Sequence, residues 1–177
     1  MSELQSYEKI LSRKNEGTHR WKVLGWLFLY LNWVLLGSLL LAAFGMSAPL
    51  LLLLTLSTVF LVRLTWKYTQ VEFEYALLDG VLVIDKIYGK KTRRAVFEGE
   101  LKHALLIAPY TEDFLRKAKE LRPLNKSIDA TSSENAENVW FLLFEKDESG
   151  LLILVEADET MLRIFRYYNA RATARKL

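Results

Sequence analysis

The chain has 177 residues, of which 51% are hydrophobic and 25% charged, and its formal net charge is +3. It contains no cysteine and only two histidines, which excludes disulfides, thiolate zinc sites, iron–sulfur clusters and cysteine nucleophiles. The mild positive charge does not indicate nucleic-acid binding, and the length favours one modest domain beside a membrane anchor over a multidomain enzyme.

The first 20 residues are polar, with scattered apolar side chains. The apolar ones recur at helical spacing and the basic ones fall on the opposite side. The apolar positions are Leu4, Tyr7, Ile10 and Leu11, and the basic positions are Lys9, Arg13 and Lys14. Residues 1–20 are therefore predicted to form either a cytoplasmic amphipathic helix along the inner leaflet or a solvated, frayed terminus, with equal weight.

Residues 21–66 contain two apolar stretches, which predict transmembrane helices at 23–44 and 48–66. The first has about 22 residues without a charge, enough to cross roughly 33 Å. The second has a shorter uncharged core and reaches the bilayer surface with a snorkelling Arg63. A buried helical hairpin in a soluble protein and a cleavable signal peptide are the alternatives. Both are disfavoured, the first by the amount of leucine and the second by the lack of a clean cleavage site before Pro49.

Basic residues flank the two apolar stretches, whereas the turn that connects them carries no charge. Lysine and arginine concentrate on the cytoplasmic side of membrane spans, so both termini are expected in the cytoplasm of a multi-pass protein of the cell membrane. Small and polar residues within the spans are expected to pack helix against helix, with Asn32 making an interhelical hydrogen bond rather than contacting a substrate. These positions are Asn32, Gly37, Ser38, Thr55, Ser57 and Thr58.

Beyond Lys67 apolar and polar residues alternate, which predicts strands in a cytoplasmic domain over residues 68–177. Asp79-Gly80 and Gly89-Lys90-Lys91 are turn signals between them. Four strands are expected to follow one another as a meander, at 71–77, 81–88, 92–98 and 102–108.

The second half of this domain mixes helices and strands. Acidic residues precede basic ones in 111–121, which predicts a short helix ended by Pro123. Asp158 is a suitable N-cap for a final helix to Ala172, whose apolar stripe could cover the open end of a barrel. The strands expected between the helices are 126–130, 139–145 and 151–156.

This order of elements, four meandering strands, three more and a closing helix, resembles a pleckstrin-homology-like (PH-like) domain. The chain also resembles a family of small two-span membrane proteins from Gram-positive anaerobic bacteria that carry a bacterial PH-like domain. The matching motifs are VEFEYALLDGVLVIDKIYGKKTRR (71–94), IAPY (107–110), IDATSS (128–133) and VEADETML. The resemblance implies a membrane α-helical hairpin plus an α+β domain, a seven-stranded antiparallel barrel or sandwich closed by a C-terminal helix. The helix at 111–121 departs from the simplest PH-like pattern.

Signatures of catalysis are missing from the sequence. No Gly-rich phosphate loop is present. His19 is expected at the membrane edge and His103 inside a strand, so neither a zinc triad nor a Ser-His-Asp site can be assembled from them. His103 is expected to be an ordinary strand residue, and Glu72 and Glu74 to lie on a solvated face rather than act as paired acids. We therefore expect a non-enzymatic protein with no cofactor, metal site or small-molecule substrate.

A run of basic residues surrounds the second turn and lies close in sequence to the end of the second span. With the bilayer nearby, these side chains could contact anionic lipid headgroups, each contributing about 1 kcal/mol. The candidate contacts are Arg63, Lys67, Lys86, Lys90, Lys91, Arg93 and Arg94. An ordinary solvated basic turn is the competing interpretation.

Two functions fit this organisation. The leading hypothesis is an interaction or assembly module, in which the PH-like domain docks a protein partner or copies of itself at the inner leaflet. The alternative is a small transporter or lipid-handling subunit whose helices oligomerise around a pathway, although its spans lack the buried charge that pathways usually require. Only a short connection, 65–70, separates the second span from the first predicted strand, so the domain is expected to sit against the leaflet.

Overall fold

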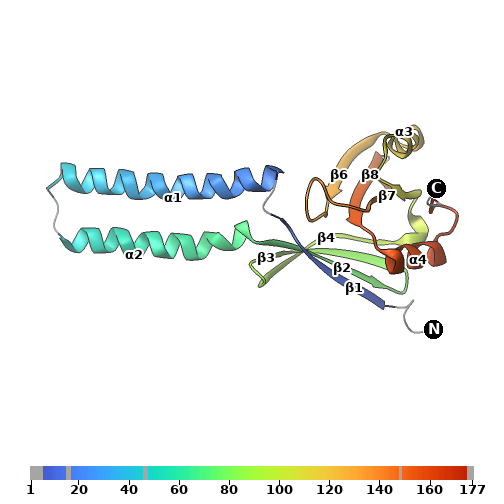
Figure 1. Cartoon of the computed structure of the whole chain (residues 1–177), viewed down its shortest axis with the longest axis horizontal. Coiled ribbons are helices and arrows are strands. Elements are labelled where there is room, and N and C mark those ends of the chain that lie inside the picture. The colour runs from blue at the N-terminus through green and yellow to red at the C-terminus, as the bar shows by residue number, and fades with distance from the viewer. Residues whose placement is uncertain (1–5, 15–16, 46–47, 148, 175–177) are drawn as a thin grey trace.

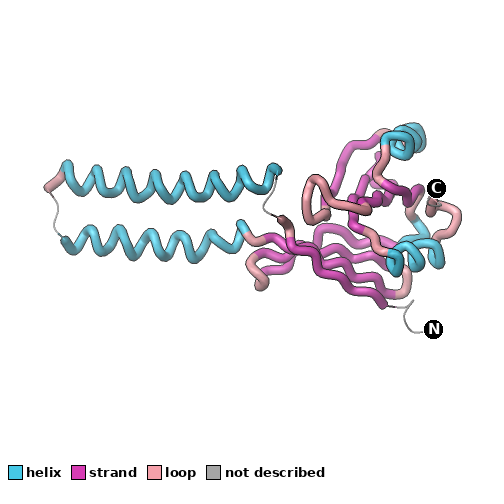
Figure 2. Tube along the Cα trace, in the orientation of Figure 1, coloured by secondary structure: helices cyan, strands magenta, loops and turns pink. Residues whose placement is uncertain are grey.

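Two helices that lie side by side project from one end of a domain built from two β-sheets (Figures 1 and 2). The structure is a computed structural model that describes residues 6–14, 17–45, 48–147 and 149–174. The helices are α1 (Gly17–Ala43), which begins six residues before the predicted span, and α2 (Ala48–Thr65), which is close to the predicted bounds. Both are long and apolar enough to cross a membrane, and almost none of their length is buried against the protein. The alternative of a hairpin buried in a soluble core is therefore wrong.

The two helices pack through a small residue and one hydrogen bond. Gly37 faces Leu54 so closely that a Cβ atom at position 37 would lie 2.5 Å from a Leu54 methyl group. Near the domain, the Tyr30 hydroxyl and Thr65 Oγ1 are 2.6 Å apart. Asn32 makes no interhelical bond, because its amide donates to the Phe28 carbonyl of its own helix at 2.9 Å. The prediction for Asn32 is wrong, whereas packing at Gly37 is confirmed.

The segment before α1 is a strand, β1 (Ser6–Ser12), which pairs antiparallel with β2 (Val71–Leu78). Both predictions for this segment, an amphipathic helix and a frayed terminus, are wrong over these residues, and Leu4 lies outside the described ones. Tyr7 and Leu11 are four apart and so share a face in a helix and in a strand alike. Ile10 distinguishes the strand from the helix. It is 57% exposed on the side away from the core, whereas the predicted helix would place it on the same face as Tyr7 and Leu11.

The helical hairpin is therefore an insertion between two neighbouring strands. On the entering side, the backbone amides of Arg13 and Lys14 donate to the carbonyls of Val71 and Ser132 at 2.8 and 2.7 Å. On the leaving side, the 3-10 turn η2 (Trp66–Thr69) runs into β2 with one intervening residue. Both ends of the hairpin are thus tied to the domain.

The eight strands form two sheets of four, not one seven-stranded antiparallel barrel. Sheet one has the order β1-β2-β3-β4 and is antiparallel throughout, and sheet two has the order β5-β7-β8-β6, with β6 parallel to β8. The remaining strands are β3 (Val81–Tyr88), β4 (Thr92–Glu100), β5 (Leu106–Pro109), β6 (Leu124–Asp129), β7 (Val139–Lys146) and β8 (Ser149–Glu156). The coarser prediction of a helical hairpin together with an α+β domain is confirmed, although the first strand of the domain precedes the hairpin.

The predicted fourth strand of the meander is wrong in its first half. Residues Leu101–His103 form the 3-10 turn η3, and the chain then crosses to sheet two, where β5 pairs with β7. His103 is accordingly an exposed turn residue and not a strand residue. The crossing is fixed by Asn169, whose side-chain amide donates to the carbonyls of Leu101 and Ala104 at 2.8 and 3.0 Å.

The main core lies between the sheets and is closed at one end by α4 (Glu159–Tyr168), which is shorter than predicted. The short helix predicted at 111–121 is confirmed as α3 (Glu112–Leu121), which packs on the opposite face of sheet two. Strands β7 and β8 are consequently buried on both faces, which explains their continuous apolar sequence. Tyr75 is fully buried between the sheets, where its hydroxyl donates to the Ala130 carbonyl at 2.6 Å.

Asp158 joins α4 to β1. Its carboxylate caps α4 by accepting from the Met161 amide at 2.9 Å, and it accepts from the Tyr7 hydroxyl of β1 at 2.5 Å, with Lys9 nearby. Partial burial works to raise the pKa of Asp158, but the hydrogen bonds from Tyr7 and Met161 and the charge of Lys9 outweigh it and hold that pKa below its usual value.

Asp158→Ala is expected to lower the free energy of unfolding by about 1–2 kcal/mol at neutral pH, as for other lost N-caps. Because the folded pKa is depressed, this contribution is present above the unfolded value of about 3.9 and is lost as the pH falls through the folded pKa. Urea unfolding of the full chain in detergent should therefore separate the two proteins at neutral pH and bring them together in acid. Asp113→Ala, at an 82% exposed side chain, is the control and should have little effect. A gap that persists unchanged in acid would contradict the assignment.

Candidate functional site at the foot of the helices

The turn between β3 and β4 packs directly against the foot of α2. The Gly89 amide donates to the Gln70 carbonyl at 2.9 Å, and a Cβ atom on Gly89 would lie 2.7 Å from the Lys67 Cβ. Gly89 also has φ +55°, a left-handed conformation that glycine adopts without a steric penalty. Because of this close contact, the next two residues, Lys90 and Lys91, lie beside the connection between α2 and the domain.

Four cations meet at this position, and we call them the basic foot: Arg63, Lys67, Lys90 and Lys91. None of them lies within ion-pair distance of a carboxylate among the described residues, and the Lys67 ammonium instead lies 5.0 Å from the centre of the Tyr68 ring. Unpaired cations that gather beside an apolar helix form a surface that favours anionic groups.

A groove of about 620 Å³ opens between α2 and the turn. Its upper wall is apolar, with Val59 and Val62 of α2, and its lower wall carries Arg63, Lys67 and Lys91. Trp66 separates it from a second groove of about 440 Å³ on the side of α1, which Arg13 and Lys90 also line. The first groove therefore passes from apolar to basic along the axis of α2, which suits a lipid whose headgroup lies below its acyl chains. The second groove is more polar, and Glu72 also lines it.

His19 fixes the relative position of the two helices at this end. It is 7% exposed, and its Nε2 donates to the Thr69 carbonyl at 2.9 Å, which joins the start of α1 to η2. Sequence reasoning placed His19 at the membrane edge but missed this contact and the place of Arg13 in the second groove. Both depend on the pairing of β1 with β2, which was not predicted.

The other three candidate residues are separated from the basic foot. Arg93 forms an ion pair with Glu74 at 2.7 Å, and the Lys86 ammonium lies 5.8 and 5.0 Å from the centres of the Phe73 and Tyr88 rings. Arg94 is exposed and pairs in register with Lys86 on the ladder between β3 and β4. The structure thus brings together four of the seven predicted residues, and Lys86 and Arg93 have partners within the domain.

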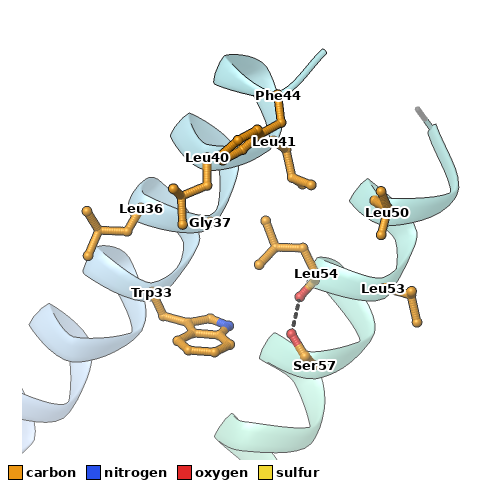
Figure 3. A pocket seen from close by; sticks show the side chains of 10 residues that line it. All are labelled: Trp33, Leu36, Gly37, Leu40, Leu41, Phe44, Leu50, Leu53, Leu54 and Ser57. Carbon is orange, nitrogen blue, oxygen red and sulfur yellow. Dashed lines mark hydrogen bonds between the residues drawn. The ribbon is translucent and has the colours of Figure 1, made fainter. Parts of the chain in front are cut away.

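A third groove, of about 650 Å³, lies between the two helices at the end remote from the domain (Figure 3). Trp33 and Leu40 of α1, Phe44 just after its end, and Leu50 and Leu54 of α2 line this groove, and Leu54 packs closely on Gly37 (Figure 3). The only hydrogen bond drawn there, from Ser57 Oγ to the Leu54 carbonyl at 2.8 Å, stays within α2. The lining is apolar and fits a lipid chain or a further helix.

Gly89→Ala should disturb the seat of the turn on α2. The left-handed backbone and the contact with Lys67 together are expected to cost about 1–3 kcal/mol in the free energy of unfolding. Thermal unfolding of the full chain in detergent checks this. Gly25→Ala is the matched control, because nothing lies within 4 Å of its added methyl group on α1. Equal melting temperatures for the two variants would show that packing of the turn against α2 does not contribute to stability.

Comparison with known proteins identifies one family. The sequence matches the family described as bacterial PH-like domain (DUF6106) over residues 5–175, a range that includes β1, the helical hairpin and both sheets. No curated protein and no solved structure matches the chain.

Proposed function

Since the chain belongs to this family of bacterial PH-like domains, which confirms the predicted resemblance, we propose that it is a membrane-anchored interaction module that works by binding and not by catalysis. The observation that carries the proposal is the insertion of the hairpin between the paired strands β1 and β2. An anchor attached through two adjacent strands of the sheet holds the domain at a set height and angle above the bilayer. A binding surface on such a domain is presented to partners in a fixed orientation.

The proposed orientation places both termini in the cytoplasm. Because β1 and β2 pair with each other, the chain before α1 and the chain after α2 belong on the same side of a membrane that the hairpin crosses. Arg20 and Lys22 at the start of α1 and the basic foot at the end of α2 support a cytoplasmic location for that side, since lysine and arginine concentrate on the cytoplasmic side of membrane spans.

The basic foot is proposed to rest on anionic headgroups of the inner leaflet. Its four cations lie where α2 leaves the apolar region, and lysine or arginine near an anionic surface contributes about 1 kcal/mol each. Such contacts complement the covalent anchor, because they favour one tilt of the domain over others.

A second candidate function is a lipid-handling or transport subunit, and the groove in Figure 3 is the observation that favours it. Two helices cannot enclose a pathway, so this function requires several copies whose helices meet around it. Residues 23–62 carry no charge, which disfavours a route for polar solutes and leaves an apolar lipid chain as the cargo of this candidate.

The orientation can be tested by cysteine labelling, since the natural chain has no cysteine. Ser47→Cys lies in the connection between the helices, and Asn135→Cys is exposed on the loop between β6 and β7. In intact cells a membrane-impermeant maleimide should label the first and not the second, and lysis should expose the second. Labelling of both positions in intact cells would overturn the two-span orientation, as would labelling of neither.

The headgroup contacts can be tested on the full chain in detergent, by native mass spectrometry with phosphatidylglycerol or phosphatidylcholine added. Lys90→Gln/Lys91→Gln is expected to weaken retention of phosphatidylglycerol by about tenfold or more, since two contacts of about 1 kcal/mol are removed. Lys119→Gln/Lys126→Gln removes the same charge far from the helices and is the matched control. Equal loss in both variants, or equal retention of the two lipids by the natural chain, would refute a headgroup site at the basic foot.

A further inference from the structure

The outer face of sheet one, turned away from sheet two, is uncovered. No described helix or strand lies on it (Figure 1), and Leu78 and Ile10 are 59% and 57% exposed there. The register of the four strands arranges its side chains in cross-strand rows. The three rows remote from the helices are Ser6, Leu78, Val81 and Glu100; Glu8, Ala76, Val83 and Glu98; and Ile10, Glu74, Asp85 and Ala95.

This outer face combines apolar and acidic side chains: the central strands contribute Leu78, Ala76, Val81 and Val83 to two of the rows, and Glu74 and Asp85 to the third. Its three rows contain five carboxylates and no basic residue, although the whole chain has a net charge of +3. Arg93 and Lys102, from outside the rows, pair with Glu74 and Glu100. The carboxylates of Glu8, Asp85 and Glu98 have no ion-pair partner among the described residues. A surface of this kind is complementary to one that carries arginine beside an apolar or aromatic group.

The chain itself carries such a surface on the solvent side of α4. Arg163, Arg166 and Tyr167 form an exposed stripe at helical spacing, and the ring of Tyr167 is 67% exposed. Neither arginine has an ion-pair partner in the described part of the chain. Arginine and tyrosine are also the residue types that most often dominate the energy of protein interfaces.

The two surfaces cannot meet within one molecule. The apolar side of α4 faces the core between the sheets, so its stripe points away from the protein, and the outer face lies on the far side of sheet one. Both nevertheless occur at the end of the domain remote from the helices, because the Tyr168 ring packs on Gly80 in the turn between β2 and β3. Two copies anchored in one membrane thus hold the two surfaces at a similar distance from the bilayer.

We infer that the outer face of sheet one in one copy binds the Arg163–Tyr167 stripe of α4 in a second copy. Contact between two outer faces would instead set carboxylates against carboxylates, which is unfavourable. In a head-to-tail arrangement each copy keeps one of the two surfaces free, so the contact extends into a ring or an open row on the membrane. The inference rests on the proposed function and deepens it, since it names a second copy of this chain as the partner.

Disulfide crosslinking of the full chain in one membrane tests the contact. Val83→Cys, between Glu8 and Glu98 in its row, and Tyr167→Cys are prepared as separate chains and mixed. The expected product is a disulfide-linked dimer that joins position 83 of one chain to position 167 of the other. A dominant dimer of two Val83→Cys chains, or no product that joins positions 83 and 167, would overturn the inference.

Charge reversal then tests the chemistry. Glu8→Lys/Glu98→Lys in the Val83→Cys chain should reduce the mixed dimer by about tenfold or more, because like charges then face each other. Adding Arg163→Glu/Arg166→Glu to the Tyr167→Cys chain should restore the yield of the mixed dimer, because opposite charges then face each other again. A loss of yield that was caused by misfolding would not be restored in this way. Lys117→Glu/Lys119→Glu on α3 is the matched control and should leave the yield unchanged.

The result also separates this inference from the proposed function. Crosslinks between positions 83 and 167 can be absent while a photocrosslinker at position 83 captures one other protein in native membranes, in a way that depends on Glu8 and Glu98. In that case the second copy is the wrong partner, and the proposal of an interaction module remains valid. If position 83 captures no protein and copies do not crosslink, both proposals fail at this face.

Discussion

The pairing of β1 with β2 is the constraint on which the other features depend. Seven residues at the start of the chain align with β2, beginning with Ser6 opposite Leu78, across an intervening pair of helices. This ladder supplies the edge of sheet one and brings both ends of the hairpin to the same end of the domain. It also positions Arg13 and His19 beside Trp66 and Thr69. Without this pairing, only the connection from α2 to β2 would hold the helices to the sheet.

The distribution of charge over the domain follows from the same arrangement. Strands of sheet one run away from the helices, so their register sorts residues by distance from the helices as well as by face. Cations collect at the near end, around Lys67 and Lys91, and carboxylates collect on the outer face at the far end, around Glu8 and Glu98. In the proposed membrane orientation, an anionic leaflet would attract the first set and repel the second, and both effects would favour an upright domain.

Much of this architecture could be predicted from the sequence, and the parts that could not share a physical reason. Local signals were sufficient for α1, α2, α3 and the β2–β3 hairpin, since length, capping and turn residues act within one element. Tyr7 and Leu11 fitted two periodicities, and only their long-range partners decide between them. The parallel contact of β6 with β8 and the crossing at Leu101 likewise depend on pairing, which no local pattern encodes. For the same reason the sequence could group seven basic residues but could not separate Arg93, bound to Glu74, from Lys91.

The insertion of the hairpin also has a consequence for biogenesis. During synthesis β1 emerges first and has no partner until β2 follows, about 60 residues later in a chain that ribosomes extend at roughly 5–20 residues per second. In the proposed membrane topology, the helices would enter the bilayer and pair in between, which would bring Lys14 and Gln70 close together before the sheet exists. Pairing of the helices in the membrane would thereby reduce the loss of chain entropy that accompanies closure of this long loop. Completion of sheet one is then coupled to correct insertion, so a chain whose anchor fails to insert also lacks a properly closed sheet edge.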